Sequence, residues 1–380
     1  MNAGQNVDFK EVGHCGGKIT FIFRKDGNGQ LLSSIKWASQ RPNPAALAGV
    51  YALDNGLAVC PLFFAGLGQP WSPPPFQGCV PVIIGSDSEG HFGHKCSNCD
   101  RYWRSNPYPN FCPYCGVALQ ISSCLSDAQK TYVGHYVKTL NDATESALSG
   151  LVPNEQKEVE IDLDSVADAV ASPEKPDFYL AEESQQKKFN CYRCGHFNDV
   201  LGRYAYCSTC GVRNDSQIAS EEIEEIRNSI NNGGSLSTAL RSGVALFDSF
   251  IRQFVEQILH LVPMTPRRRD QLDKQAFHDL KFVRESFQDC LDITLCREMS
   301  ATDITFAEKM FHRRHLHEHK GSIVDQKYID DSGDPNVRIG QELRETREDV
   351  HRFLSILSRM FNNAHEQFNS IIPPAVIDKP

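Results

Sequence analysis

The chain lacks the sequence features of a secreted or membrane-spanning protein. Its N-terminus has no basic segment followed by an apolar one, which is the pattern of a secretory signal peptide. Its longest apolar run, residues 57–68, contains a proline and is too short to cross a bilayer. We therefore expect a soluble, cytoplasmic protein with no membrane partner.

Positive charge is also scarce. The 39 lysines and arginines face 48 aspartates and glutamates, a formal net charge of −9. Each occupied site of four thiolates and one dication would add two further negative charges. Long-range electrostatics therefore do not attract nucleic acid to the whole molecule. Any contact with nucleic acid has to come from a local basic patch.

Length and composition indicate several domains. At 380 residues, with 40% hydrophobic and 23% charged residues, the chain fits two or three globular domains. We expect a multidomain α+β protein whose N-terminal part is β-rich and whose C-terminal part is an all-α helical bundle. The expected segments are a β-rich domain (1–90), a first zinc ribbon (91–125), an acidic linker (126–186), a second zinc ribbon (187–215) and the helical bundle (220–372).

Cysteine is the most informative residue type. Eight of the 14 cysteines form four Cys-x-x-Cys pairs, which in a reducing compartment indicate metal sites. Within each ribbon, twelve residues separate two such pairs, so that two tight turns can direct four thiolates at one ion. A thioredoxin-like redox pair is disfavoured because one pair would suffice. We predict two structural Zn²⁺ ions per chain, one bound by Cys96, Cys99, Cys112 and Cys115, and one by Cys191, Cys194, Cys207 and Cys210.

The two ribbons look like a duplication. Phe111 and Tyr206 precede equivalent cysteines, and Gly116 and Gly211 follow equivalent ones. Aromatic and basic residues at 101–104 could stack on a nucleic acid. The alternative, which we favour, is that they form the core of their own small hairpin.

The flanking segments predict simpler structures. Residues 18–24 and 31–37 read as a hairpin around a turn at 26–29. Prolines at 61 and 81 push two further strands to sheet edges. The acidic, proline-interrupted segment 155–183 reads as a mobile linker with a short helix near 164–170. Such a strip could also mimic nucleic acid and cover a basic site.

The C-terminal part carries helical periodicity. Apolar residues recur at steps of three and four in 235–261, from 265 onward, from about 300 to 319, and in 341–371. Ser300 and Asp303 fit a capping box at the start of the third helix. Four long amphipathic segments indicate a helical bundle.

One stretch of this part is unusually rich in histidine and arginine. Residues 312–319 hold four histidines, two arginines and a glutamate. Imidazole titrates near neutral pH and guanidinium binds phosphate with two hydrogen bonds, a combination that suits proton transfer beside a phosphodiester. The alternative is a solvated helix end whose cations interact favourably with the helix dipole.

Residues 235–371 resemble the HEPN superfamily of helical domains. The family motif is an arginine, usually followed by a polar residue, with a histidine four to six positions further on. Arg314 and His319 fit it, with His315 as the polar follower, and Arg313 fits at one residue more. The glycine, Val-Asp and tyrosine of 321–328 also look like HEPN-like proteins.

The resemblance implies metal-independent cleavage of RNA by a homodimer. His319 would deprotonate the 2′-hydroxyl, and Arg314 would stabilise the charge that develops on the phosphate. Such proteins often belong to toxin or phage-defence systems. In such a system the ribbons would serve to recognise RNA or to regulate the nuclease, and a protein regulator would be a further partner. The other hypothesis is a non-catalytic protein whose helical domain dimerises and whose ribbons bind nucleic acid or protein.

Helix geometry separates these hypotheses. Residues five apart do not share a helix face, so Arg314 and His319 converge only if the helix ends between them, with Gly321 as its stop.

Other interpretations of the helical part remain. His315 and His319 could instead bind a metal ion as a pair. A thiol nucleophile at Cys290 or Cys296 is a third reading, disfavoured by their apolar context. Apolar residues outside the main stripes suggest the dimer surface: Val255, Phe277 and Phe282.

Overall fold

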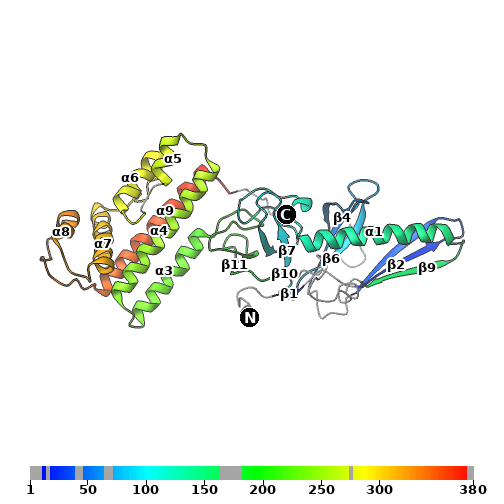
Figure 1. Ribbon diagram of the computed structural model, residues 1–380, viewed down its shortest axis with the longest axis horizontal. Helices are drawn as coiled ribbons and strands as arrows, with labels where there is room; N and C mark the ends of the chain where they lie inside the picture. Colours follow the sequence, from blue (N-terminus) through cyan, green and yellow to red (C-terminus); the bar gives the residue numbers. More distant parts are fainter. Residues whose placement is uncertain are drawn as a thin grey trace, which may run out of the picture. The chain divides into compact units, whose positions relative to one another are not determined.

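The computed structural model describes residues 11–13, 18–38, 46–63, 72–162, 182–273 and 277–374. These residues form two compact units, the first within Met1–Val212 and the second within Arg213–Pro374, and each is described by itself. The expected mixed α+β architecture is confirmed. The first unit holds the described strands and one long helix, whereas the second holds helices (Figure 1).

The first unit consists of small antiparallel sheets. Their orders are β1-β10, β3-β2-β9, β5-β4-β6 and β11-β12-β8-β7. The strands are β1 (Glu11–Gly13), β2 (Lys18–Lys25), β3 (Leu31–Ala38), β4 (Leu47–Ala52), β5 (Ala58–Leu62), β6 (Val80–Gly85), β7 (Phe92–Lys95), β8 (Tyr102–Ser105), β9 (Gln156–Asp162), β10 (Glu182–Glu183), β11 (Lys187–Asn190) and β12 (Phe197–Val200).

The predicted N-terminal hairpin and edge strands are present. Strand β2 pairs with β3 from Lys18 opposite Ala38 to Lys25 opposite Leu31. In the next sheet, β5 with Pro61 and β6 with Pro81 lie on either side of β4. Proline occupies these edges because it has no N–H to donate to a second neighbour.

The predicted acidic linker is wrong for residues 127–162. Helix α1 (Asp127–Gly150), after a 3₁₀ turn at Ile121–Ser123, packs across the sheet, with Tyr136 edge-on to Phe21 at 5.3 Å. Strand β9 then pairs with β2 from Asp162 opposite Lys18 to Gln156 opposite Arg24. The acidic side chains face solvent while apolar ones such as Val133 and Val159 face the core, so composition alone concealed the order. The short helix expected near 164–170 lies outside the described residues.

The β-rich segment, the first ribbon and α1 share one core. Its buried members come from several strands and from α1, among them Phe21, Val82, Phe92, Trp103 and Tyr132. Residues that were expected to form separate domains are therefore parts of one compact unit.

The second unit is a helical bundle, as expected. Its helices are α3 (Asp215–Asn231), α4 (Leu236–Leu261), α5 (Pro266–Asp273), α6 (Leu280–Leu291), α7 (Ala301–His319), α8 (Gln326–Ser332) and α9 (Arg347–Ile371). The segment after residue 265, expected as one helix, is two, because Asp279 caps a new start by accepting from the Phe282 amide. The last long helix begins at Arg347, later than expected.

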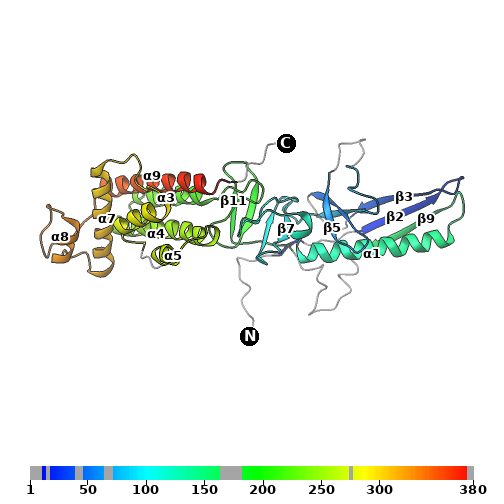
Figure 2. The same ribbon diagram turned by 90° about the horizontal axis from the view of Figure 1, so that it is seen from above.

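The long helices α3, α4 and α9 lie side by side, and α7 crosses their end (Figures 1 and 2). Phe311 of α7 packs edge-on against Phe247 of α4 and Phe353 of α9. One face of α7 is thereby fixed to the bundle, and its Arg/His end extends beyond these contacts toward α8. Among the described residues, none of the helices combines the length and the apolar character needed to cross a bilayer.

Candidate functional site

Each predicted ribbon brings four cysteine sulfurs together. In both groups all Sγ atoms lie within 4.8 Å of one another. Closest pairs are separated by 3.6 to 3.9 Å, for example Cys96 from Cys115 and Cys191 from Cys210. Tetrahedral coordination with metal–sulfur bonds of about 2.3 Å requires sulfurs about 3.8 Å apart. Both groups could therefore hold a metal ion.

The two ribbons pack against each other with matching contacts. A Cβ on Gly116 would lie 3.2 Å from the Tyr206 ring, and one on Gly211 would lie 3.4 Å from the Phe111 ring. Both glycines have positive φ, at 69° and 71°. The central strands β8 and β12 join the two hairpins into one sheet. The repeated sequence positions are thus the reciprocal contacts of a paired structure.

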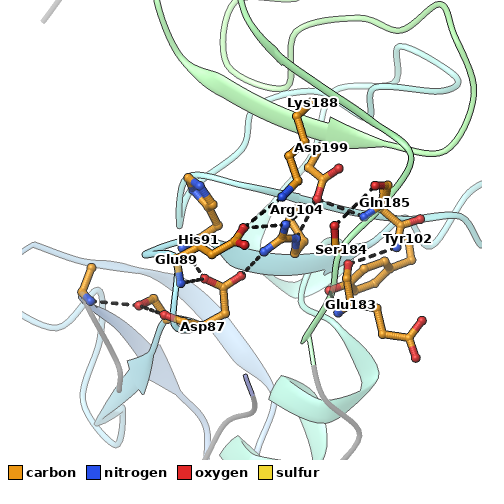
Figure 3. A network of polar contacts seen from close by, with 12 residues as sticks. Asp87, Glu89, His91, Tyr102, Arg104, Glu183, Ser184, Gln185, Lys188 and Asp199 are labelled. Carbon is orange, nitrogen blue, oxygen red and sulfur yellow. Dashed lines mark hydrogen bonds and ion pairs between the residues drawn. The ribbon is translucent and has the colours of Figure 1, made fainter. Parts of the chain in front are cut away.

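Among the aromatic and basic residues at 101–104, two serve the core of the first unit, whereas Arg101 is exposed and lies over the Tyr114 ring at 4.0 Å. Trp103 and Arg104 are both fully buried. The Arg104 guanidinium contacts Asp87 at 2.5 Å and Asp199 at 2.6 Å, both carboxylates being buried, and Glu89 at 3.0 Å (Figure 3). Arg104 is therefore unavailable to nucleic acid, as the favoured reading expected.

Within the Arg/His stretch, two residues belong to a buried polar network. Arg313 contacts Asp334 at 3.0 Å and Glu345 at 3.1 Å, and both carboxylates have no exposed side-chain surface. His317 lies between Glu345 and Ser322, at 2.8 Å from each. The network fastens the segment between α7 and α9 to α7. Arg313 is thereby occupied structurally.

The other three motif residues, Arg314, His315 and His319, lie on the outside of α7. The helix continues to His319, so Arg314 and His319 are separated by about 140° around its axis, at about 100° per residue. The helix end that would make them converge within one chain is absent between them. Arg314 instead approaches Glu318 at 3.2 Å, and the rings of His315 and His319 lie 4.9 Å apart.

Arg314 and His315 line a cavity of about 430 Å³ between α7, α8 and the start of α6. Besides Arg314, its cations are Lys281, Lys309 and Lys327. Two further imidazoles and three carboxylates also line it: His278, His312, Asp279, Glu308 and Asp331. The sequence analysis did not single out His278 or the three lysines, since only the fold brings them to the motif.

The lysines of this cavity are free to bind an anion. Glu308 is paired with Arg284 at 2.6 Å, and Asp279 caps α6. Lys281, Lys309 and Lys327 form no ion pair in the part of the chain that the structure describes. Asp331 likewise forms no ion pair among the described residues, so the cavity combines one free carboxylate with three ammonium groups, Arg314 and imidazoles. The cations outnumber this carboxylate, which suits the binding of a phosphate.

His315 is suited to accept a proton. Partial burial, followed by the positive charge of His319, Lys327, Arg314 and Lys320, lowers the pKa of His315 below its usual range. A lowered pKa keeps the imidazole neutral near pH 7, the form that acts as a base.

The other predicted sites are placed as follows. Cys290 and Cys296 are buried, and burial raises the pKa of both thiols, so they are core residues. Among the described residues, only the two cysteine groups bring three or more possible metal ligands together. The pair of His315 and His319 belongs to no such group. Val255 and Phe277 are buried in the bundle core, whereas Phe282 is 41% exposed.

Comparisons with known proteins give no relative. No family model, no curated protein and no solved structure matches the chain.

Proposed function

We propose that the helical unit is a HEPN-like, metal-independent endoribonuclease. The observation that carries this proposal is the cavity in which Arg314 and His315 meet three unpaired lysines. The resemblance to the HEPN superfamily supplies the reaction class, and the cavity supplies a place for a phosphodiester beside a neutral imidazole.

In the proposed reaction, an imidazole of the His315–His319 pair takes the proton of the RNA 2′-hydroxyl. The freed oxygen attacks the adjacent phosphorus, and the bond to the 5′-oxygen breaks, leaving a 2′,3′-cyclic phosphate. The leaving oxygen takes a proton from water or from a second imidazole. Arg314 stabilises the charge on the phosphate oxygens. The motif assigns the base to His319, while the cavity favours His315.

We further propose that the cysteine groups bind Zn²⁺ and that the protein is a homodimer. Four thiolates in tetrahedral arrangement suit zinc, and structural sites of this kind are closed. The ribbons would then serve as a scaffold that binds an RNA or protein partner, and through it they would recognise the substrate or regulate cleavage. A dimer through the helical unit would place two copies of the motif in one cleft.

A direct test is to incubate the full-length protein with mixed single-stranded RNA in EDTA, beside His315→Ala and His319→Ala variants. We expect wild-type protein to cut RNA and to leave DNA intact, and at least one variant to be inactive. Circular dichroism shows whether EDTA unfolds the ribbons. Wild-type rates from both variants would contradict the catalytic proposal.

One observation favours the second function, a non-catalytic RNA-binding protein. Arg314 and His319 point to different sides of a continuous helix, which a binding surface tolerates and a single-chain catalytic pair does not. This function predicts RNA binding without cleavage under every metal and pH condition.

A further inference from the structure

The cavity of about 430 Å³ that Arg314 and His315 line, called the basic cavity below, has a neighbouring cavity on each side along α7. Toward the C-terminal end, a cavity of about 150 Å³ shares His312, His315, Lys327 and Asp331 with it. Toward the N-terminal end, a cavity of about 370 Å³ shares Thr305, Lys309 and Ser332 with it. Because neighbouring cavities share lining residues, they adjoin one another along α7, and we call the three together the groove.

The groove follows α7 along most of its length. Its lining residues on α7 run from Ala301 to Leu316, and they include Lys309 and Arg314, which lie about 140° apart around the helix axis. From Ala301 to Leu316 these lining residues extend over about 23 Å, at about 1.5 Å per residue. A groove of this length suits an extended chain better than a single small molecule.

The chemistry of the groove changes along its length. Its middle contains Lys281, Lys309 and Lys327, which form no ion pair within the described part of the chain, together with Arg314. Its N-terminal end is walled by Phe306 and Pro335, with Ala301 and Gly333 beside them. Cations in the middle match backbone phosphates. The recess beside Phe306, whose buried ring already faces the Arg352 guanidinium at 4.3 Å, has room for one unpaired base against its rim.

We propose that this groove binds single-stranded RNA along α7, with backbone phosphates at the lysines and one unstacked base in the recess of Phe306 and Pro335. This inference rests on the proposed function for the identity of the ligand, and it adds the strandedness and the base subsite. A duplex is disfavoured because its bases are stacked and paired and cannot enter a recess.

The test measures the binding of a short single-stranded 2′-O-methyl RNA, whose blocked 2′-oxygen prevents cleavage, to the full-length protein. We expect Lys281→Gln/Lys309→Gln/Lys327→Gln to weaken binding and to reduce the salt slope by about 2, since each phosphate contact contributes about 0.7. The matched control is Lys138→Gln/Arg267→Gln/Arg268→Gln, which removes three exposed cations outside the groove. It should leave the slope nearly unchanged.

The base subsite is tested by Ala301→Leu, which fills the recess at an exposed position. We expect binding to weaken about tenfold, an effect of the size expected for losing one bound base. Ala245→Leu makes the same change at an exposed site on α4, away from the groove, and should have no effect. Unchanged binding by Ala301→Leu would overturn the base subsite.

Two other outcomes would overturn the groove itself. One is equal binding of a duplex of the same sequence, and the other is an equal loss in the lysine variant and its control. Cleavage of ordinary RNA is measured separately. Binding with the expected variant pattern but no cleavage would contradict the nuclease proposal and support the groove. Cleavage that the groove variants leave unaffected would support the nuclease proposal and contradict the groove.

Discussion

Arg313 and Arg314 are adjacent and have opposite environments. The Arg313 side chain is 11% exposed and is held by two buried carboxylates. Arg314 is 20% exposed and lines the cavity of about 430 Å³, and its one ion pair among the described residues is with Glu318, a partly exposed residue of the same helix. The helical angle of about 100° between neighbours separates a residue of the core network from a residue of the site.

Arg314→Lys should abolish RNA cleavage and leave stability nearly unchanged. Lysine keeps the charge but lacks the planar fork that binds two phosphate oxygens. The pair with Glu318 is near the surface and contributes at most about 1 kcal/mol. Single-turnover cleavage and urea unfolding measure the two effects. Glu318→Gln is the companion variant, and it should strengthen RNA binding by releasing Arg314; weaker binding would contradict this role.

The pH dependence of cleavage should reflect His315. Because its pKa is lowered, His315 is neutral at pH 7 and gains a proton only as the pH falls below the usual histidine value of 6.5. The acid limb of kcat/KM should therefore have its midpoint below 6.5. His315→Ala should slow cleavage by roughly 10²–10⁴-fold. A midpoint above 6.5, or a limb that persists in His315→Ala, would assign the proton transfer to another group.

At the scale of elements, α7 combines a capped start with an anchored end. Ser300 accepts a hydrogen bond from the Asp303 amide at 3.1 Å. Near the other end, the Glu345 carboxylate accepts hydrogen bonds from Arg313 and His317 of α7. Burial raises the pKa of Glu345, but the hydrogen bond from His317 and the charge of Arg313 outweigh it, so the pKa is lowered overall.

Glu345→Gln should destabilise the helical unit by about 2 kcal/mol at pH 7, since it removes one of the two buried carboxylates that pair with Arg313 and leaves only Asp334. A carboxyl group with a lowered pKa stabilises the fold fully above its unfolded value of 4.5 and stops doing so as the pH falls through its folded pKa. The difference from wild type in urea unfolding should therefore shrink below pH 4.5.

The control for this prediction is Glu342→Gln. Glu342 forms an exposed pair with Arg344, whose side chain is 83% accessible, so its loss should be negligible. Equal effects of the two variants would show that Glu345 is not the anchor.

For the whole molecule, metal binding should decide whether the first unit folds. We expect two zinc ions per chain in reducing buffer, measured by elemental analysis. Cys207→Ser should lose one ion and unfold the joined ribbons, because metal binding is folding free energy at such sites, of order 10 kcal/mol. Cys79→Ser, outside both cysteine groups, should keep both ions. Full zinc content in Cys207→Ser would refute the assignment.

Association belongs to the same scale. Val255 and Phe277 are in the core, so the candidates for a dimer surface on the helical unit are exposed apolar residues such as Phe282, Ile323 and Ile339, at 41%, 42% and 62%. Light scattering should show a dimer at micromolar concentration. Ile323→Glu/Ile339→Glu should give monomers, whereas Leu148→Glu, 59% exposed in the first unit, should not. A wild-type monomer would contradict the prediction.

Local patterns in the sequence were sufficient for features that depend on nearby residues. Four cysteines spaced within about twenty positions determine each four-sulfur group that could hold a metal, and the hairpin of β2 and β3 follows from alternation around a short turn. The Ser300 cap likewise depends on a hydrogen bond three residues away.

Only the tertiary structure decided the features that depend on distant partners. An acidic segment became α1 and β9 because β2 offered a face and an edge to pack against. Arg313 was separated from Arg314 by carboxylates 21 and 32 positions away. Lys281 and Lys327 reached the motif through α6 and α8. Sequence periodicity specifies which residues share a face, but burial and charge pairing depend on what covers that face, which is a property of the packed chain.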